Sequence, residues 1–143
     1  MKNSIIKIFR WALALMGFSV ASCAKVEYGT PYSTFRVSGK VVDETGQPVN
    51  NILVTPMSDS QVYNTQTDNY GEFSVIGRSG PGSFDKVVVA FSDIDGDQNG
   101  GVHEGKTVEI SLVKTREPSK DDSGWYQGEF SASDQDITLK KIK

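Results

Sequence analysis

Apolar and polar residues alternate in short runs along most of the chain after residue 34. The two clearest runs are Phe35 to Val42 and Lys106 to Val113, in which apolar side chains occupy every second position. A period of two places successive side chains on opposite faces of a β-strand, so each run predicts a half-buried strand. The other predicted strands are Ile52–Val54, Val62–Tyr63, Tyr70–Ile76, Lys86–Phe91, Trp125–Phe130 and Asp136–Ile142.

This pattern predicts an all-β fold. Seven or eight short strands separated by turn residues are typical of an antiparallel β-sandwich, and residues 35–143 show no convincing helical periodicity. A chain of 143 residues suits one domain with a single core. We therefore expect residues 35–143 to form one β-sandwich domain. Its inward side chains are expected to include Val87, Val89, Phe91, Val108, Ile110, Leu112, Ile137 and Leu139.

The first 22 residues have the pattern of a signal peptide instead. A positively charged start precedes the apolar run 11–20, which is too short to span a bilayer as a helix by itself. Such a segment is removed from the mature protein, so it is set apart from the fold. The basic residues of the start are Lys2, Lys7 and Arg10.

The sequence VASC at residues 20–23 resembles the lipobox of bacterial lipoproteins, in which the cysteine receives diacylglycerol before cleavage. Cys23 is the only cysteine of the chain and stands where a lipobox requires it. The resemblance implies an acylated, for example palmitate-bearing, Cys23, a tether over residues 23–34, and anchoring to a membrane of the cell envelope. The outer membrane is the expected one, and its face stays open. Two other readings are secretory cleavage after Ala24 and a signal anchor.

The charge of the chain excludes one large class of function. Lys and Arg number 15 against 18 Asp and Glu, a formal net charge of −3. Residues 1–22 contain three of the basic residues and no acidic one, so the mature chain has 12 against 18 and a charge of −6. An acidic surface argues against nucleic-acid binding and against electrostatic attachment to anionic lipid. The membrane link is then the lipid on Cys23.

The strings FRVSGKVVDETGQPVNNILVTP and TDNYGEFSV, within residues 35–75, resemble the start of carboxypeptidase regulatory-like, transthyretin-like domains. Gly46 and Pro48 supply a tight connection between strands, and Gly71 lets the chain turn into the strand that carries Phe73 and Val75. The resemblance covers about 40 residues of the mature chain. It implies a transthyretin-like or Ig-like sandwich and says little about function, because such modules serve many functions.

The whole mature chain also resembles a narrower group, the lipoproteins of Bacteroidetes that are encoded beside a radical SAM protein. The shared features are Cys23, the opening from Phe35 to Val75, the DIDG..NGG string from Asp93 to Gly101, and the late Trp125. What the resemblance implies is a genomic association. It suggests that this chain is a client or a partner of a radical SAM enzyme.

The loop from Ser92 to Gly105 resembles a calcium loop, which has oxygen ligands at positions 1, 3 and 5, glycine at 6 and glutamate at 12. A register from Asp95 has the glycine but ends at Lys106, and one that starts two residues earlier reaches Glu104 but lacks the glycine. The alternative is a hydrated hairpin loop whose Asp, Asn and Gly serve turn geometry. If calcium binds, the expected ligands are Asp93, Asp95, Asp97, Asn99 and, as an optional closing ligand, Glu104.

No set of residues predicts catalysis. His103 is the only histidine, which excludes a histidine-rich zinc site within one chain. A lone loop histidine is expected to be exposed to solvent rather than catalytic, because a catalytic one needs a positioned partner. Trp125 and Tyr126 have two readings, an exposed ligand platform or core residues at the start of a strand.

The sequence therefore predicts a lipid-anchored, non-enzymatic β-sandwich of the bacterial envelope that binds or scaffolds, with calcium as the candidate cofactor. The alternative is a client or partner of a neighbouring radical SAM enzyme. The ligand and the oligomeric state stay open.

Overall fold

The computed structural model describes residues 29–58, 62–81 and 84–142. The predicted signal peptide, Cys23 and the first part of the tether lie outside the described residues. Every regular element is a β-strand, which confirms the all-β prediction, and the described chain has no helix long and apolar enough to cross a membrane. The strands are β1 (Tyr32–Asp43), β2 (Ile52–Met57), β3 (Thr65–Gln66), β4 (Glu72–Ser79), β5 (Lys86–Asp93), β6 (Lys106–Ser111), β7 (Val113–Arg116) and β8 (Tyr126–Leu139).

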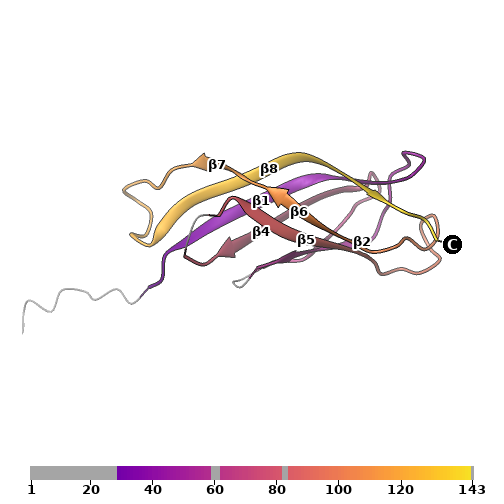
Figure 1. Ribbon diagram of the computed structural model, residues 1–143, viewed down its shortest axis with the longest axis horizontal. Helices are drawn as coiled ribbons and strands as arrows, with labels where there is room; N and C mark the ends of the chain where they lie inside the picture. Colours follow the sequence, from indigo (N-terminus) through magenta and orange to yellow (C-terminus); the bar gives the residue numbers. More distant parts are fainter. Residues whose placement is uncertain (1–28, 59–61, 82–83, 143) are drawn as a thin grey trace, which may run out of the picture.

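The strands form two four-stranded sheets, as the β-sandwich prediction expects (Figure 1). The β1 sheet has the order β4-β1-β8-β7, and the β5 sheet has the order β3-β2-β5-β6. All neighbouring strands are antiparallel except β1 and β8, which are parallel. These two strands are the first and the last, so no hairpin forces them to run in opposite directions.

The C-terminal part differs most from the predicted strands. The two strands predicted at residues 125–130 and 136–142 are one continuous strand, β8. The charged segment that begins at Lys114, predicted to be a loop, instead continues the edge strand β7, whose four residues are all exposed. An edge strand pairs through its backbone on one side only. Because the side chains of β7 are all exposed, its sequence shows no alternation of apolar and polar residues.

Two shorter elements also differ from the prediction. The strand predicted at Val62–Tyr63 lies instead at residues 65–66 as β3, while Val62 forms an isolated bridge with Gly77. The strand predicted to run to residue 113 ends at Ser111 as β6. After the buried Leu112, the chain crosses to the β1 sheet as β7, so a single residue accomplishes the change of sheet.

The hydrophobic core lies between the two sheets. Phe73 of the β1 sheet and Phe91 of the β5 sheet meet edge to face, with ring centroids 5.4 Å apart. Of the predicted inward residues, Val108 is half-buried and the others are buried, because alternation along each strand directs them to one face. The buried cluster comprises Phe35, Val37, Val41, Val49, Ile52, Val54, Phe73, Val75, Val87, Val89, Phe91, Ile110, Leu112, Ile137 and Leu139.

The two glycines of the predicted turns both adopt a positive φ, +83° at Gly46 and +73° at Gly71. Their surroundings differ. A Cβ atom at Gly46 would meet nothing within 4 Å, whereas one at Gly71 would lie 2.3 Å from the carbonyl oxygen of Val41 in β1. Gly71 therefore allows both the turn and the close approach of the chain to β1.

Candidate functional site

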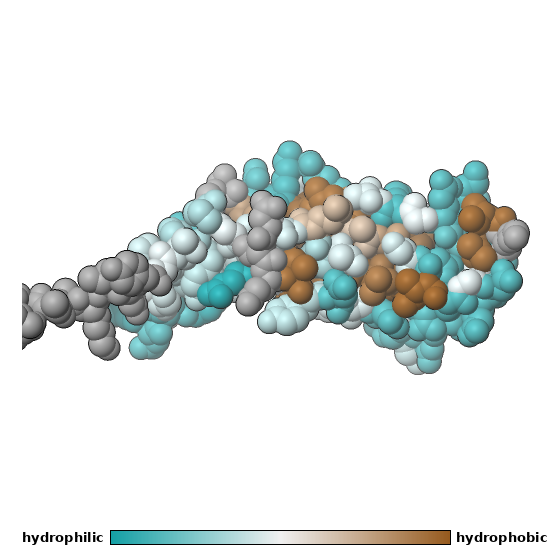
Figure 2. Space-filling model, turned by 90° about the horizontal axis from the view of Figure 1, so that it is seen from below, coloured by the Kyte–Doolittle hydropathy of each residue, from teal (hydrophilic) through white to brown (hydrophobic). Residues whose placement is uncertain are grey.

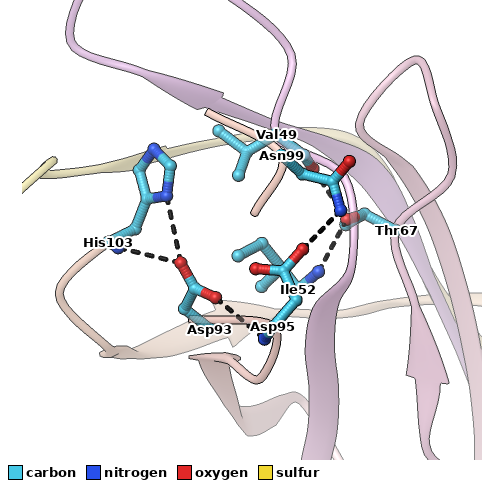
Figure 3. Close-up of polar contacts among 7 residues, drawn as sticks. All are labelled: Val49, Ile52, Thr67, Asp93, Asp95, Asn99 and His103. Atoms are coloured by element: carbon cyan, nitrogen blue, oxygen red, sulfur yellow. Dashed lines mark hydrogen bonds and ion pairs between the residues drawn. The ribbon is translucent and has the colours of Figure 1, made fainter. Parts of the chain in front are cut away.

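Asp93 and His103 form a buried pair at the two ends of the acidic loop (Figure 3). Their side chains are 4% and 2% exposed, and Asp93 Oδ2 accepts hydrogen bonds from the backbone N–H of His103 at 2.8 Å and from its Nδ1 at 3.1 Å. Because an ionised carboxylate can only accept, Nδ1 carries the proton. The expectation that His103 is exposed is therefore wrong. Asp93 and His103 are ten residues apart in the sequence, so no local sequence pattern predicts that they pair.

The return limb of this loop is joined to the C-terminal segment. The backbone N–H of Glu104 donates to the carbonyl of Lys140 at 2.7 Å, and that of Ile142 donates to the carbonyl of Val102 at 2.8 Å. Together with the Asp93–His103 pair, these bonds tie the β5–β6 connection to the end of β8. The acidic loop thus has a structural role in linking the two sheets.

The residues predicted to hold calcium are directed to different partners. Asp93 faces His103, the Asp95 carboxylate accepts a hydrogen bond from the Asn99 amide (Figure 3), and Asp97 and Glu104 are exposed. Among the residues that the structure describes, no three or more His, Cys, Asp or Glu are grouped so as to hold a metal ion. Calcium binding by this loop stays a prediction.

Thr67 is a second buried polar residue near this end of the β5 sheet, and Figure 3 shows it beside Val49 and Ile52. Its hydroxyl donates to the carbonyl of Val49 at 2.7 Å and accepts from the backbone N–H of Ile52 at 3.0 Å. The Ile52 N–H belongs to the first residue of β2, and the Val49 carbonyl lies three residues before that strand. Thr67 therefore satisfies backbone groups that the β2–β3 ladder does not reach.

A ladder of arginine and tyrosine side chains crosses the outer face of the β1 sheet at its other end. Arg78 of β4 lies over the Tyr32 ring, 3.5 Å from the centroid. The rings of Tyr32 in β1 and Tyr126 in β8 have centroids 5.4 Å apart, and Arg116 of β7 lies 5.4 Å from the Tyr126 centroid. Each of the four strands contributes one side chain, in the order in which the strands pair. Sheet order alone brings these distant residues together.

An open groove of about 500 Å³ lies along this ladder. We call it the arginine–tyrosine groove and define it by Tyr32, Arg36, Tyr63, Arg78, Arg116 and Tyr126. The Tyr126 hydroxyl is 3.0 Å from Thr34 Oγ1 and accepts a hydrogen bond from Arg116 Nη1 at 3.5 Å. These contacts fix the central ring, so the floor of the groove is preformed.

One arginine of the groove is neutralised by a carboxylate. Arg116 Nη2 donates to both oxygens of Asp122, at 3.0 and 2.8 Å, and the backbone N–H of Ser119 donates to the same carboxylate at 2.8 Å. The hydrogen bonds to Asp122 raise the pKa of Arg116. The bond from Ser119, and then that from Arg116, lower the pKa of Asp122. Both groups therefore stay charged at neutral pH, and each is the ion-pair partner of the other.

Both readings of the aromatic pair at the start of β8 describe part of the structure. Tyr126 is buried, yet it lines the groove and lies outside the core cluster. Trp125 is half-buried against the backbone of Gly29, and it lines an adjoining hollow together with Tyr32 and Arg78. Sequence reasoning missed the arginines of the ladder, because Arg78 follows the predicted strand Tyr70–Ile76 and Arg116 falls in a segment predicted to be a loop.

No family model and no curated protein matches the chain. The solved structures to which the chain is similar include three dioxygenases. Hydroxyquinol 1,2-dioxygenase from Pseudomonas putida DLL-E4 has 11% identity and a TM-score of 0.47, over 84% of this chain and 64% of that one. 3-Chlorocatechol 1,2-dioxygenase from Rhodococcus opacus 1CP has 14% identity and a TM-score of 0.44, over 82% of this chain and 62% of that one.

Catechol 1,2-dioxygenase from Pseudomonas arvilla C-1 has 13% identity and a TM-score of 0.46, over 82% of this chain and 55% of that one. The chain thus spans between 55% and 64% of the length of these enzymes. At such identities and TM-scores the likeness carries no argument about activity.

Proposed function

We propose that this protein is a lipid-anchored, non-enzymatic module of the bacterial cell envelope that binds a ligand in the arginine–tyrosine groove. The observation that supports binding is the ladder from Arg78 to Arg116, in which two tyrosine rings in tilted contact each lie against an arginine on an outer face. Convergent polar groups beside aromatic side chains are typical of ligand sites.

The position of the groove agrees with a role near a membrane. Tyr32, at the start of β1, lines the groove and lies nine residues after Cys23. Nine extended residues reach at most about 30 Å. A lipid on Cys23 would therefore keep this end of the sandwich close to the bilayer surface.

The anchor is tested by Cys23→Ala. We expect the variant to leave the membrane fraction and to lose acyl labelling, because the lipid is the only proposed link to the bilayer. Ser22→Ala is the matched control, since it keeps a small residue before the cysteine and should remain in the membrane. Partition between membrane and soluble fractions measures both. A Cys23→Ala protein that stays in the membrane would contradict the proposal.

The binding role predicts that a soluble glycan or other envelope component changes the environment of the groove. Tyr63 and Ile76 are 60% and 45% exposed and line it, whereas Tyr70 is 71% exposed and lies elsewhere. In an NMR titration with a panel of such compounds, we expect at least one to shift the resonances of Tyr63 and Ile76 and not those of Tyr70. A panel that shifts none of the groove resonances would count against binding.

Partnership with a radical SAM enzyme stays a prediction that rests on the sequence resemblance alone. A client of such an enzyme would carry a covalent change on the mature chain. Intact mass of the protein made with and without the neighbouring enzyme checks this. Equal masses would remove the client reading.

A further inference from the structure

We propose that the arginine–tyrosine groove binds the phosphate group of a phosphorylated sugar, an inference that rests on the proposed binding role. The first support is Arg78, which is held in place without being neutralised. Its guanidinium stacks on the Tyr32 ring, and no carboxylate of the described chain lies within ion-pairing distance of it. Stacking occupies the face of a guanidinium and leaves the N–H groups at its edge, which match the oxygen atoms of a phosphate.

Arg36 can reach the same anion. It points to the outer face of β1, opposite Ile76 of β4, while Arg78 lies opposite Thr34, two residues away. Such diagonal neighbours are about 7–8 Å apart, within the reach of long side chains. Arg36 is exposed, lines the same groove, and has no ion-pair partner within the described part of the chain.

The charges of the groove favour an anion. Its lining includes three arginines and two carboxylates, Asp122 and Glu129, so the groove has one net positive charge, and Asp122 neutralises Arg116. Arg36 and Arg78, which have no ion-pair partner in the described part of the chain, offer two guanidinium edges to the oxygen atoms of a phosphate monoester, which carries about −1.5 to −2 at neutral pH. The whole chain has a net charge of −3, so the groove is a local positive patch on an acidic protein.

The surroundings of the two arginines suit a sugar ring. The exposed ring of Tyr63 lines the groove beside them and offers a flat surface on which a sugar can lie. Figure 2 shows one face of the molecule, on which the end where β1 begins is mainly hydrophilic. The groove itself is lined by both aromatic and charged side chains.

The test is a titration of the full chain carrying Cys23→Ala with glucose 6-phosphate, glucose and inorganic phosphate, followed by NMR. We expect glucose 6-phosphate to bind more tightly than glucose. Arg78→Gln and Arg36→Gln should each weaken its binding about tenfold. Lys40→Gln removes the same charge from an exposed position of the same strand outside the groove, and should change the affinity less than about twofold. Melting temperatures establish that each variant is folded.

A second arm distinguishes a lipid-borne from a free sugar phosphate. Sedimentation with phosphatidylcholine vesicles, with and without phosphatidylinositol 4-phosphate, should show retention that depends on the phosphorylated lipid and on Arg78 if the ligand is a headgroup. Equal effects of Arg78→Gln and Lys40→Gln in both arms would overturn the inference. Glucose binding as tight as glucose 6-phosphate would also overturn it, while leaving the binding role of the groove intact. Failure of every phosphorylated probe would overturn it as well, and the glycan panel then decides the binding role.

Discussion

Asp93→Ala is expected to lower the free energy of unfolding by about 2–3 kcal/mol, the usual cost of leaving buried hydrogen-bond donors without their charged acceptor. The Asp93 side chain is 4% exposed and accepts hydrogen bonds from the backbone and ring of His103 and, at 3.2 Å, from the backbone N–H of Asp95. The variant leaves these buried donors without an acceptor. Urea unfolding measures the loss, which is a large share of the roughly 5–15 kcal/mol that stabilises a typical domain.

Asp97→Ala is the matched control, because Asp97 belongs to the same loop but is exposed. We expect its unfolding free energy to stay within about 0.5 kcal/mol of the wild type. Measurement in calcium and in chelator separates the structural role of Asp93 from calcium binding. A loss at Asp93 that is equal in both solutions supports the structural role. Losses of similar size in both variants, seen only with calcium, would instead support the calcium site.

The contribution of Asp93 is also expected to depend on pH. Burial acts to raise its pKa, but hydrogen bonds from the backbone N–H and ring of His103 and from Asp95 outweigh this and lower the pKa of the folded state. The stabilisation is therefore complete above the unfolded-state pKa of about 3.9 and is lost as the pH falls through the lower folded-state value. The stability difference between wild type and Asp93→Ala should shrink below about pH 4. A constant difference down to pH 2 would contradict this.

Gly71→Ala is expected to lower the free energy of unfolding by about 3 kcal/mol or more. An alanine at a positive φ costs about 1–2 kcal/mol, and a side chain forced into a packed position costs about 1–3 kcal/mol in addition. Both apply at Gly71, where φ is +73° and a Cβ atom would lie 2.3 Å from the Val41 carbonyl oxygen. Urea unfolding at neutral pH measures the loss.

Gly46→Ala separates these two costs. Gly46 has a similar φ of +83°, but its Cβ atom would meet nothing within 4 Å, so only the backbone cost of about 1–2 kcal/mol is expected. If the two variants lose the same stability, the close approach at Gly71 does not matter. The comparison needs no ligand and no anchor, so it tests the fold alone.

The alternation of apolar and polar residues determined the fold class and most of the core. Phe35, Val37 and Val41 share one face because side chains in a strand repeat every two residues, and the same holds for Val87 and Phe91. This information is local, so the sequence displays it. For β7 the pattern failed, because an edge strand that exposes its whole side-chain set has no buried face to reveal.

The two functional regions depended on the tertiary structure to different degrees. The sequence pointed to the acidic loop and named Asp93 and His103. It offered Asp93 as a calcium ligand or a turn residue, which stays untested, and it wrongly expected His103 to be exposed to solvent. Only the folded structure shows that Asp93 and His103 are hydrogen-bond partners, because their pairing requires the loop between them to bring together residues ten positions apart. Local patterns report turn chemistry and cannot report which buried partner a carboxylate finds.

The arginine–tyrosine groove was decided by the tertiary structure alone. Its ladder joins residues 32, 78, 116 and 126, and their neighbourhood follows from the strand order β4-β1-β8-β7 and the parallel pairing of β1 with β8. Strand order depends on how the two sheets pack as a whole. It therefore depends on contacts between residues far apart in the sequence, which no short segment of the chain reveals. By itself, the sequence placed Tyr126 on a strand and Arg36 on the outward face of another, but it placed Tyr32 in the tether and Arg116 in a loop. The sheet order made them one site.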